Sequence, residues 1–308
     1  MLGAILSCSE PIKVHTQEMD RTYLVVEGLI TDQPELEQFV KLSVSVPYLT
    51  PETGIPFVSG AEVVVSDGTT DYLFEEQEVT PDPGKPEETE KTGVYKAPEG
   101  FRAESGRKYS LNVKATVEGE IHRYSAEAKM PEVACSLEKI DYSYNGNTKQ
   151  KMDSLWTVLM WARDYAAKDG RYLVRMAVNG HRIPFGSCLM MEDKYFNGKQ
   201  IEAFPVGLLA QTAANQKKYG ESAKFLEEGD VLTADVYLLT PEYYSFMAKI
   251  QGDGGGTNNM PLMSSQPANP PTNLSGDGDV MGFFAACAVV SASCTVTDPF
   301  QTINYQPE

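Results

Sequence analysis

The chain has 308 residues, of which 42% are hydrophobic and 22% charged, a composition typical of a folded globular protein with about two domains. Its 26 lysines and arginines against 43 aspartates and glutamates give a formal net charge of -17. Such a surface repels nucleic-acid phosphates and anionic lipid headgroups. We therefore expect no nucleic-acid partner, and a membrane location would require an anchor other than a basic patch.

The chain begins with MLGAILSCSEPI, in which an apolar stretch and Ser7 directly precede Cys8. This pattern resembles a lipobox, the site at which bacterial lipoprotein signals are cut and the cysteine is acylated, although no basic residues precede it. The alternative is an ordinary apolar N-terminus with an incidental cysteine. Two or more acyl chains on Cys8 would hold the protein at a lipid bilayer. Residues 1–22 are then expected to be a signal remnant followed by a tether, residues 9–22, that reaches at most about 50 Å.

Residues 23–131 show the pattern of short strands separated by turns. YLVVEGLITD and FVKLSVSV are β-branched and apolar, and GAEVVVSDGTTDYLF holds two strand-like runs around Asp67-Gly68. YSLNVKATVEGEIHRYSA repeats this arrangement around Glu118-Gly119, with Leu111, Val113, Ala115 and Val117 on one face. The pattern predicts an immunoglobulin-like β-sandwich over residues 23–131.

An acidic insertion, residues 75–92, interrupts this domain with the sequence EEQEVTPDPGKPEETEKT. Its many acidic residues and its prolines cannot bury apolar surface, so we expect a long surface loop. The loop would be a solvated insertion at the end of a hairpin, or alternatively a loop that binds a cation or a partner.

Residues 132–308 are predicted to form a second β-rich domain with one or two short helices. SLWTVLMWA is typical of a buried central strand that carries Trp156 and Trp161 into the core, and hairpins are expected around Asn179-Gly180 and Asn197-Gly198. One helix is expected at about 208–219. The other covers TPEYYSFMAKIQ, with Thr240 as N-cap and Pro241 and Glu242 in its first turn.

A Gly-, Pro- and Asn-rich segment, residues 252–279, is expected to be a long irregular loop, and VMGFFAACAVVSASCTV a strand that closes the domain. The most apolar run in that strand is well short of the roughly 20 residues that a transmembrane helix needs.

The five cysteines include no C-x-x-C pair, which argues against a zinc ribbon or a thioredoxin-type site. Apart from Cys8, four remain: Cys135, Cys188, Cys287 and Cys294. They could form two disulfide bridges, but small buried free thiols are the favoured interpretation. Cys287 and Cys294 would face opposite sides of one regular strand, which argues against a bond between them.

Few side chains stand out as candidates for chemistry. The three histidines lie far apart, and the chain lacks the motifs of nucleotide-binding loops and of serine hydrolases, so we expect no cofactor and no catalytic residues. Asp277 and Asp279 could place two carboxylates near a calcium ion. They are weak candidates, because that ion prefers six to eight oxygen ligands. In the 240–251 helix, Tyr243, Phe246, Met247 and Ile250 form a core-facing stripe, which leaves Tyr244 as a speculative exposed ring for stacking on a ligand.

Eight stretches of the chain occur together in a fixed order: CSEPI, YLVVEGLITDQP, VKLSVSVPY, VSGAEVVVSDG, GVYKAP, DKYFNGKQI, EGDVLTADVYLLTPEYYSFM and NPPTNLSGDGDVMGFFAACAVVSAS. These segments resemble a lipoprotein family of the phylum Bacteroidota, DUF4249, a domain of unknown function. The resemblance runs from Cys8 to about Ser293. It implies a lipid-anchored envelope protein, often encoded beside TonB-dependent outer-membrane receptors, and it carries over no catalytic residues.

We therefore expect an outer-membrane lipoprotein, anchored through Cys8 and facing the periplasm or the cell surface. It would be a non-enzymatic binding or accessory subunit of a TonB-dependent uptake system, with that receptor as its partner and a ligand that the sequence does not identify. One alternative is a structural or adhesive surface protein. A second is a glycan-acting hydrolase, which needs a cleft with two facing carboxylates.

Overall fold

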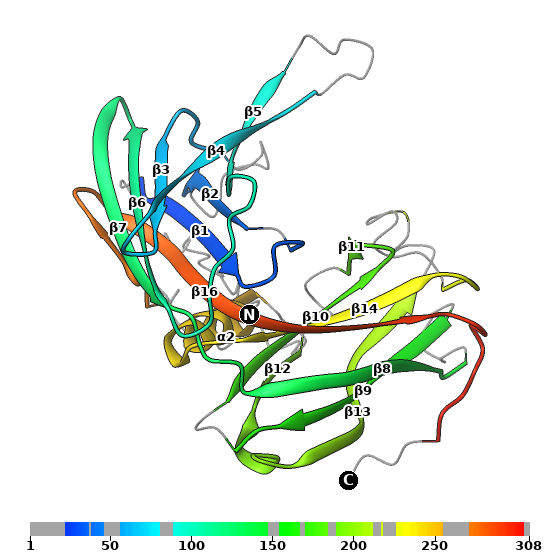
Figure 1. Cartoon of the computed structure of the whole chain (residues 1–308). Helices are drawn as coiled ribbons and strands as arrows, with labels where there is room; N and C mark the ends of the chain where they lie inside the picture. The colour runs from blue at the N-terminus through cyan, green and yellow to red at the C-terminus, as the bar shows by residue number, and fades with distance from the viewer. Residues whose placement is uncertain are drawn as a thin grey trace, which may run out of the picture.

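The computed structural model describes residues 22–36, 38–45, 56–80, 89–146, 154–166, 170–183, 189–211, 217, 226–254 and 271–304, which form the mainly β fold that the sequence predicts (Figure 1). The first seven strands are β1 (Leu24–Thr31), β2 (Phe39–Val44), β3 (Glu62–Ser66), β4 (Asp71–Val79), β5 (Glu90–Lys96), β6 (Lys108–Val117) and β7 (Glu120–Lys129). The remaining elements are β8 (Cys135–Tyr144), β9 (Ser154–Asp164), β10 (Arg171–Val178), β11 (His181–Arg182), β12 (Leu189–Glu192), η2 (Asp193–Tyr195), β13 (Gln200–Gln211), β14 (Val231–Leu238), α2 (Pro241–Gly254), β15 (Leu274–Gly276) and β16 (Val280–Thr295).

The N-terminal half is one continuous sheet that curls around a core. Its strands follow the order β16-β1-β2-β5-β4-β3-β6-β7-β15, and its far end returns to contact β16. Asn273 joins the two ends, because its side-chain amide donates to the carbonyls of Glu127 in β7 and Phe284 in β16 and its oxygen accepts from the Phe284 N–H. The expected immunoglobulin-like sandwich is therefore not confirmed for residues 23–131, since one sheet closes on itself here.

The alternation read from the sequence accounts for how this sheet buries its inner face. Leu111, Val113, Ala115 and Val117 of β6 are all buried, as predicted. The Glu118-Gly119 turn joins β6 to β7, with φ angles of 53° and 85°. Both angles are positive, as a two-residue turn of the kind that matches strand twist requires.

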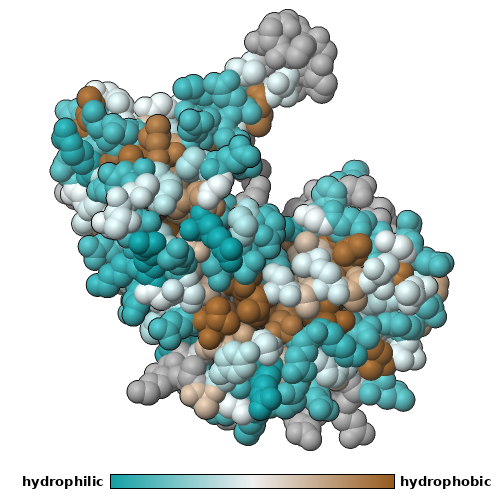
Figure 2. Space-filling model, viewed as in Figure 1, coloured by the Kyte–Doolittle hydropathy of each residue, from teal (hydrophilic) through white to brown (hydrophobic). Residues whose placement is uncertain are grey.

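Strands β4 and β5 extend beyond the sheet as a two-stranded arm (Figures 1 and 2). The base of this arm is held by the Glu76 carboxylate, which accepts hydrogen bonds from the N–H groups of Gly60 at 2.9 Å and Gly93 at 3.1 Å. The Lys91 ammonium lies 3.5 Å from the same carboxylate. The acidic insertion is therefore not a loop throughout, because β4 continues to Val79 and β5 begins at Glu90. Residues 81–88 lie outside the described residues.

Strand β16 belongs to both halves of the molecule. Residues Val280 to Cys287 pair in parallel with Leu24 to Thr31 of β1, and Ala288 to Thr295 pair antiparallel with β14. At the changeover, the Asp32 carboxylate accepts from the Val289 N–H and the Gln33 amide donates to the Val289 carbonyl. Strand pairing thus crosses the expected domain boundary between residues 131 and 132, and the division of the chain into domains stays a prediction.

The C-terminal half is a sandwich of two sheets. One is the extension β12-β10-β14-β16, with β11 also on β10, and the other is the three-stranded sheet β13-β9-β8. Alternate residues of the facing strands meet in the core, among them Tyr172, Val174, Met176, Trp156, Val158, Met160, Leu232, Ala234 and Val236. Strand β9 is the central strand of its sheet, as predicted, and Trp156 is buried. Trp161 was expected in the core but is only half-buried, with the Lys139 ammonium 3.9 Å from its ring centroid.

Three local predictions in this half are wrong. The Asn197-Gly198 turn is not a hairpin, because β12 before it pairs with β10 and β13 after it pairs with β9. Residues 208–211 were expected to start a helix but lie in β13, and of the remaining residues to 219 only residue 217 is described. Within the expected loop 252–279, helix α2 continues to Gly254 and Leu274–Gly276 form β15 on β7, while residues 255–270 lie outside the described residues.

Helix α2 covers the face of β10, β14 and β16 that points away from the sandwich core, here called the outer face. The Tyr243 N–H donates to the Thr240 hydroxyl at 3.2 Å, which confirms the predicted N-cap. A second apolar cluster lies beneath the helix and comprises Leu29, Leu173, Tyr237, Leu239, Tyr243, Phe246, Met247, Phe283, Ala285, Cys287 and Val289. None of the helices in the described part of the chain has the length and apolarity needed to cross a membrane.

The described cysteines are free thiols. Cys287 and Cys294 lie on β16, as predicted, with Cys287 beneath α2 and Cys294 against the main core. Cys135 is buried at the start of β8. Cys8 and Cys188 lie outside the described residues.

Candidate functional site

The predicted ligand-stacking ring, Tyr244, lies on α2 at the edge of the outer cluster. It is half-buried, and burial raises its pKa. Tyr243, Phe246 and Met247 face the sheet as the sequence predicts, but the prediction for Ile250 is wrong, since this residue is 40% exposed and lies outside the cluster beneath the helix. The role of Tyr244 in ligand binding stays a prediction.

The two weak metal candidates lie in the turn between β15 and β16. The Asp277 carboxylate accepts from the Arg123 N–H at 3.1 Å, and the Asp277 N–H donates to the Arg123 carbonyl at 3.0 Å. Asp279 accepts from the Leu24 N–H through its own carbonyl. The two contacts with Arg123 fasten the turn after β15 to β7. Within the described ranges no three His, Cys, Asp or Glu side chains are grouped as metal ligands.

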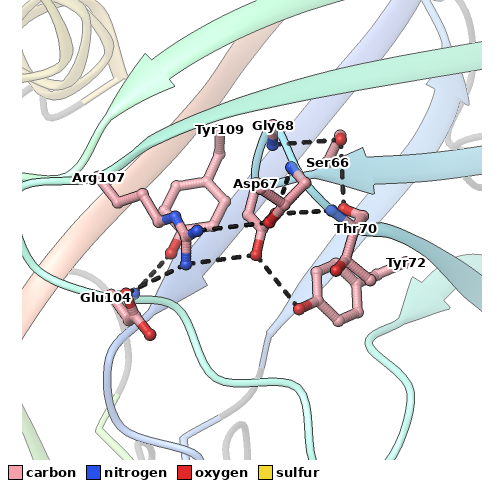
Figure 3. Close-up of polar contacts among 9 residues, drawn as sticks. Ser66, Asp67, Gly68, Thr70, Tyr72, Glu104, Arg107 and Tyr109 are labelled. Atoms are coloured by element: carbon pink, nitrogen blue, oxygen red, sulfur yellow. Dashed lines mark hydrogen bonds and ion pairs between the residues drawn. The ribbon is translucent and has the colours of Figure 1, made fainter.

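The most densely bonded carboxylate of the N-terminal half is Asp67, in the β3–β4 turn (Figure 3). Its Oδ1 accepts from the N–H groups of Thr69 and Thr70, both at 2.8 Å, and from the Thr69 hydroxyl. Its Oδ2 accepts from the Tyr72 hydroxyl at 3.3 Å and lies 3.4 Å from the Arg107 guanidinium. The bonds from Thr69 are the main reason that the pKa of Asp67 is held far below its usual range. With its oxygens already bonded, Asp67 locks a turn and leaves little capacity for a ligand.

A second polar cluster is buried in the C-terminal sandwich. The Asp164 carboxylate accepts from the Tyr172 hydroxyl at 2.5 Å and from the Gly198 N–H at 2.7 Å. Burial raises the pKa of the neighbouring Cys135 thiol to about 12. The cluster borders a small cavity, with room for about one water molecule, that is otherwise lined by Ser136 and by apolar side chains. A protonated thiol and a fully bonded carboxylate fit a structural role, in which Asp164 ties the turn at Gly198 to the sheet.

The outer face of the C-terminal half turns from apolar to polar beyond the edge of α2. Beneath the helix, Leu173, Tyr237 and Val289 lie side by side on β10, β14 and β16. Two residues further along the face, Arg175 of β10 pairs with Asp235 of β14, which pairs with Ser291 of β16. The face therefore carries a charged row directly next to an apolar one.

One arginine of this region is held in a fixed position. Arg182 of β11 donates through Nη1 to Asp235 Oδ2 at 3.1 Å and through Nη2 to the Tyr237 hydroxyl at 2.7 Å. Ser291 donates to the other Asp235 oxygen at 2.6 Å. Asp235 is 4% exposed, so its charge is stabilised by these two donors. We call Arg175, Arg182, Asp235, Tyr237 and Ser291 the arginine cluster.

The other arginine, Arg175, has its guanidinium carbon 5.2 Å from the centroid of the Tyr237 ring, while that of Arg182 lies 5.8 Å from the same centroid. Arg175 is half-buried, and no described residue accepts a hydrogen bond from it. Burial raises the pKa of the nearby Cys287 thiol to about 12, and the positive charge of Arg175 partly offsets this rise. Arg175 is thus a partly desolvated guanidinium whose five donors are not used by the other described residues.

A comparison with protein families gives a match over nearly the whole chain. The family model described as Domain of unknown function (DUF4249) matches residues 9–293. The chain belongs to the DUF4249 family. This confirms the resemblance read from the sequence. No curated protein matches the chain.

The sequence reasoning missed the arginine cluster of this DUF4249 chain, although a signal was present. Arg175 interrupts the apolar run RYLVRMAV, and Asp235 interrupts VLTADVYL. A charged residue inside an apolar strand is costly unless it is paired, so each of these residues indicates a polar cluster on the sheet. Asp235 makes its ion pair with Arg182, and Arg175 lies opposite it in the strand register. Their pairing register could not be read from either strand alone.

Proposed function

We propose that the protein is a cell-envelope lipoprotein, anchored through acylated Cys8, that binds a ligand without transforming it. In this proposal it is an accessory subunit of a TonB-dependent outer-membrane uptake system, attached to the outer membrane. We base the proposal of ligand binding on a single observation, the arginine cluster.

The cluster has the properties of a binding site more than those of a catalytic one. A buried carboxylate and a tyrosine hydroxyl hold Arg182 in place before any ligand arrives, which lowers the entropy lost on binding. Arginine keeps its proton at all relevant pH values, so it orients and stabilises charge but does not exchange protons. The buried carboxylates Asp164, Asp193, Asp230 and Asp235 all accept hydrogen bonds from neighbouring groups, so the glycan-hydrolase alternative gains no support from them.

The anchor rests on the start of the chain. The family match begins at residue 9, directly after Cys8, and LGAIL supplies the apolar residues of a lipobox. Each buried methylene contributes about 0.8 kcal/mol, so two or three acyl chains suffice to hold a protein whose net charge of -17 is repelled by anionic headgroups.

The β4–β5 arm favours the second candidate, a structural or adhesive surface protein. It projects from the N-terminal half (Figures 1 and 2), Val79 near its end is 50% exposed, and Glu78 and Glu90 on it are exposed. Because the arm projects from the molecule, its two strands are accessible to another envelope component.

Affinity capture from detergent-solubilised membranes tests the main proposal, with the protein produced in its native host and Cys8→Ser as the matched control. We expect the unchanged protein to carry acyl chains on Cys8 by mass spectrometry and to recover a TonB-dependent β-barrel receptor, and the C8S variant to be lost from the membrane fraction. An unmodified Cys8 in the native protein contradicts the anchor, and capture without such a receptor contradicts the accessory role. Deleting the gene separates the two candidates, since impaired growth on one nutrient supports uptake and impaired adhesion or envelope integrity supports the alternative.

A further inference from the structure

We propose that Arg175 and Arg182 bind the anionic group, a carboxylate or a phosphate, of a small polar ligand on the outer face of β10, β14 and β16. The inference rests on the proposed function, since it names the class of ligand that such a binding protein would take.

The charge balance of the cluster favours an anion. Among the described residues, Asp235 is the only carboxylate within 4.0 Å of either arginine, so the cluster carries two positive charges against one negative charge. The whole chain carries 17 more acidic than basic residues. A bound anion would neutralise the remaining positive charge of the cluster.

The donors are available and suitably placed. Arg182 donates one N–H of each terminal nitrogen to Asp235 and Tyr237, and its side chain is 36% exposed. None of the described residues accepts a hydrogen bond from its remaining N–H groups. All five donors of Arg175 are unused by the described residues. The guanidinium carbons of Arg175 and Arg182 lie 5.2 Å and 5.8 Å from the centroid of the Tyr237 ring, so an anionic group bound beside this side chain would be attracted by both positive charges.

The surroundings strengthen such a contact. Tyr237 is 2% exposed and Cys287 is 1% exposed, so the protein side of the cluster is apolar and excludes water. Charge-assisted hydrogen bonds gain strength where the local dielectric is low. The arginines are therefore backed by a dry surface and exposed to a ligand on the other side.

The residues beside the cluster indicate the rest of the ligand. Ser291 and Ser293 are exposed on β16, and the Ser293 hydroxyl lies 2.9 Å from that of Thr233 on β14. A row of hydroxyls offers both donors and acceptors but little apolar surface. This favours a hydrophilic organic anion, with hydroxyl or amide groups, over a fatty acid.

Titration of the isotope-labelled 308-residue chain, followed by NMR, tests the inference with inorganic phosphate in one arm and succinate in the other. We expect either probe to shift the backbone amide signals of Arg175, Arg182 and Ser291. Tighter binding of phosphate indicates a phosphate-bearing ligand and tighter binding of succinate a carboxylate, while equal affinities support the shared anion chemistry.

Arg175→Gln is expected to weaken binding of the better probe by about tenfold or more, because a hydrogen bond to a charged group contributes about 1.5–3 kcal/mol. The matched control is Arg163→Gln, which removes the same charge from an exposed arginine on β9 in the other sheet. Tyr237→Phe keeps the ring in the core but removes the acceptor of Arg182, and should weaken binding by a smaller factor. Far-UV circular dichroism checks the fold of each variant, and Y237F keeps the test valid if R175Q does not fold.

The inference is overturned if neither probe shifts signals at the cluster, or if R175Q and R163Q weaken binding equally. The titration needs neither the acyl anchor nor a receptor. Failure of the capture experiment with a positive titration would therefore reject the uptake role but retain the anion site, and the reverse result would reject only the site.

Discussion

Replacing Gly282 with alanine is expected to destabilise both halves of the molecule, although the residue lies in only one of them. Gly282 pairs with Val26 in the parallel contact between β16 and β1, with φ at +102°. A Cβ atom added there would lie 2.0 Å from the Val26 carbonyl oxygen and 2.8 Å from its carbon. The two strands would have to separate by at least about 1 Å to restore an ordinary contact.

The expected cost has two parts. The positive φ costs a residue with a Cβ atom about 1–2 kcal/mol. Separation of the strands weakens at least two backbone hydrogen bonds, each with a net contribution of about 1 kcal/mol. The total of about 3–4 kcal/mol corresponds to a fall in Tm of about 5–6 °C for a chain of this size.

Gly119→Ala is the matched control. Gly119 has a similar φ of +85° in the β6–β7 turn, but nothing lies within 4 Å of an added Cβ atom. The free energy of unfolding of the G119A variant should therefore fall only by the cost of the positive φ, about 1–2 kcal/mol. The difference between the two variants isolates the effect of forcing β16 away from β1.

Tryptophan fluorescence during urea unfolding is the assay, because both tryptophans of the chain, Trp156 and Trp161, lie on β9 in the C-terminal half. If β16 makes the two halves one cooperative unit, G282A lowers the urea midpoint of the fluorescence transition by an amount that corresponds to the whole expected loss of stability. A fluorescence midpoint equal to that of the unchanged protein, with an earlier transition seen only by far-UV circular dichroism, would refute the coupling.

Three further outcomes are expected. Asn273→Ala removes one hydrogen bond from Asn273 to β7 and two to β16, and should lower the free energy of unfolding by about 2–4 kcal/mol in the same urea assay. An unchanged midpoint would contradict the role of Asn273 in closing the sheet. Asp67→Asn should lower Tm at neutral pH, and the difference in Tm between this variant and the unchanged protein should shrink as pH falls below 3.8. The reason is that a lowered pKa stabilises the fold only at pH values where the carboxyl group of the unfolded chain is ionised. A difference in Tm that does not depend on pH would contradict this. Cys135 and Cys287, whose pKa values burial raises to about 12, should resist iodoacetamide at pH 8 in the native protein and react after unfolding, as peptide mass spectrometry would show, and rapid native labelling of either would contradict their burial.

Local features of the fold were predictable because local interactions determine them. The β6 alternation, the Glu118-Gly119 turn and the Thr240 cap each depend on a few consecutive residues. The Asn197-Gly198 turn shows the limit of this reasoning. Its composition correctly indicates a turn, but whether the flanking strands pair with each other is decided by the distant strands β9 and β10.

The pairing of β16 with β1 could not be predicted, because no local signal specifies a partner more than 250 residues away. One clue was available in the apolar run VMGFFAACAVV, which is typical of a strand covered on both faces. The structure explains that run, since Phe284, Ala286 and Ala288 face the main core and Phe283, Ala285 and Cys287 lie on the outer side with α2. The arginine cluster was missed for the same reason, because its residues meet only through the register of three strands.

The late position of β16 in the chain has a consequence for biosynthesis. The first strand to leave the ribosome, β1, obtains one of its two neighbours only when residues 280–287 have been made. At roughly 5–20 residues per second, β1 spends many seconds with an unpaired edge. Chains truncated before residue 280 would keep that edge permanently and offer it to other polypeptides, so premature termination should yield insoluble products and not a stable N-terminal fragment.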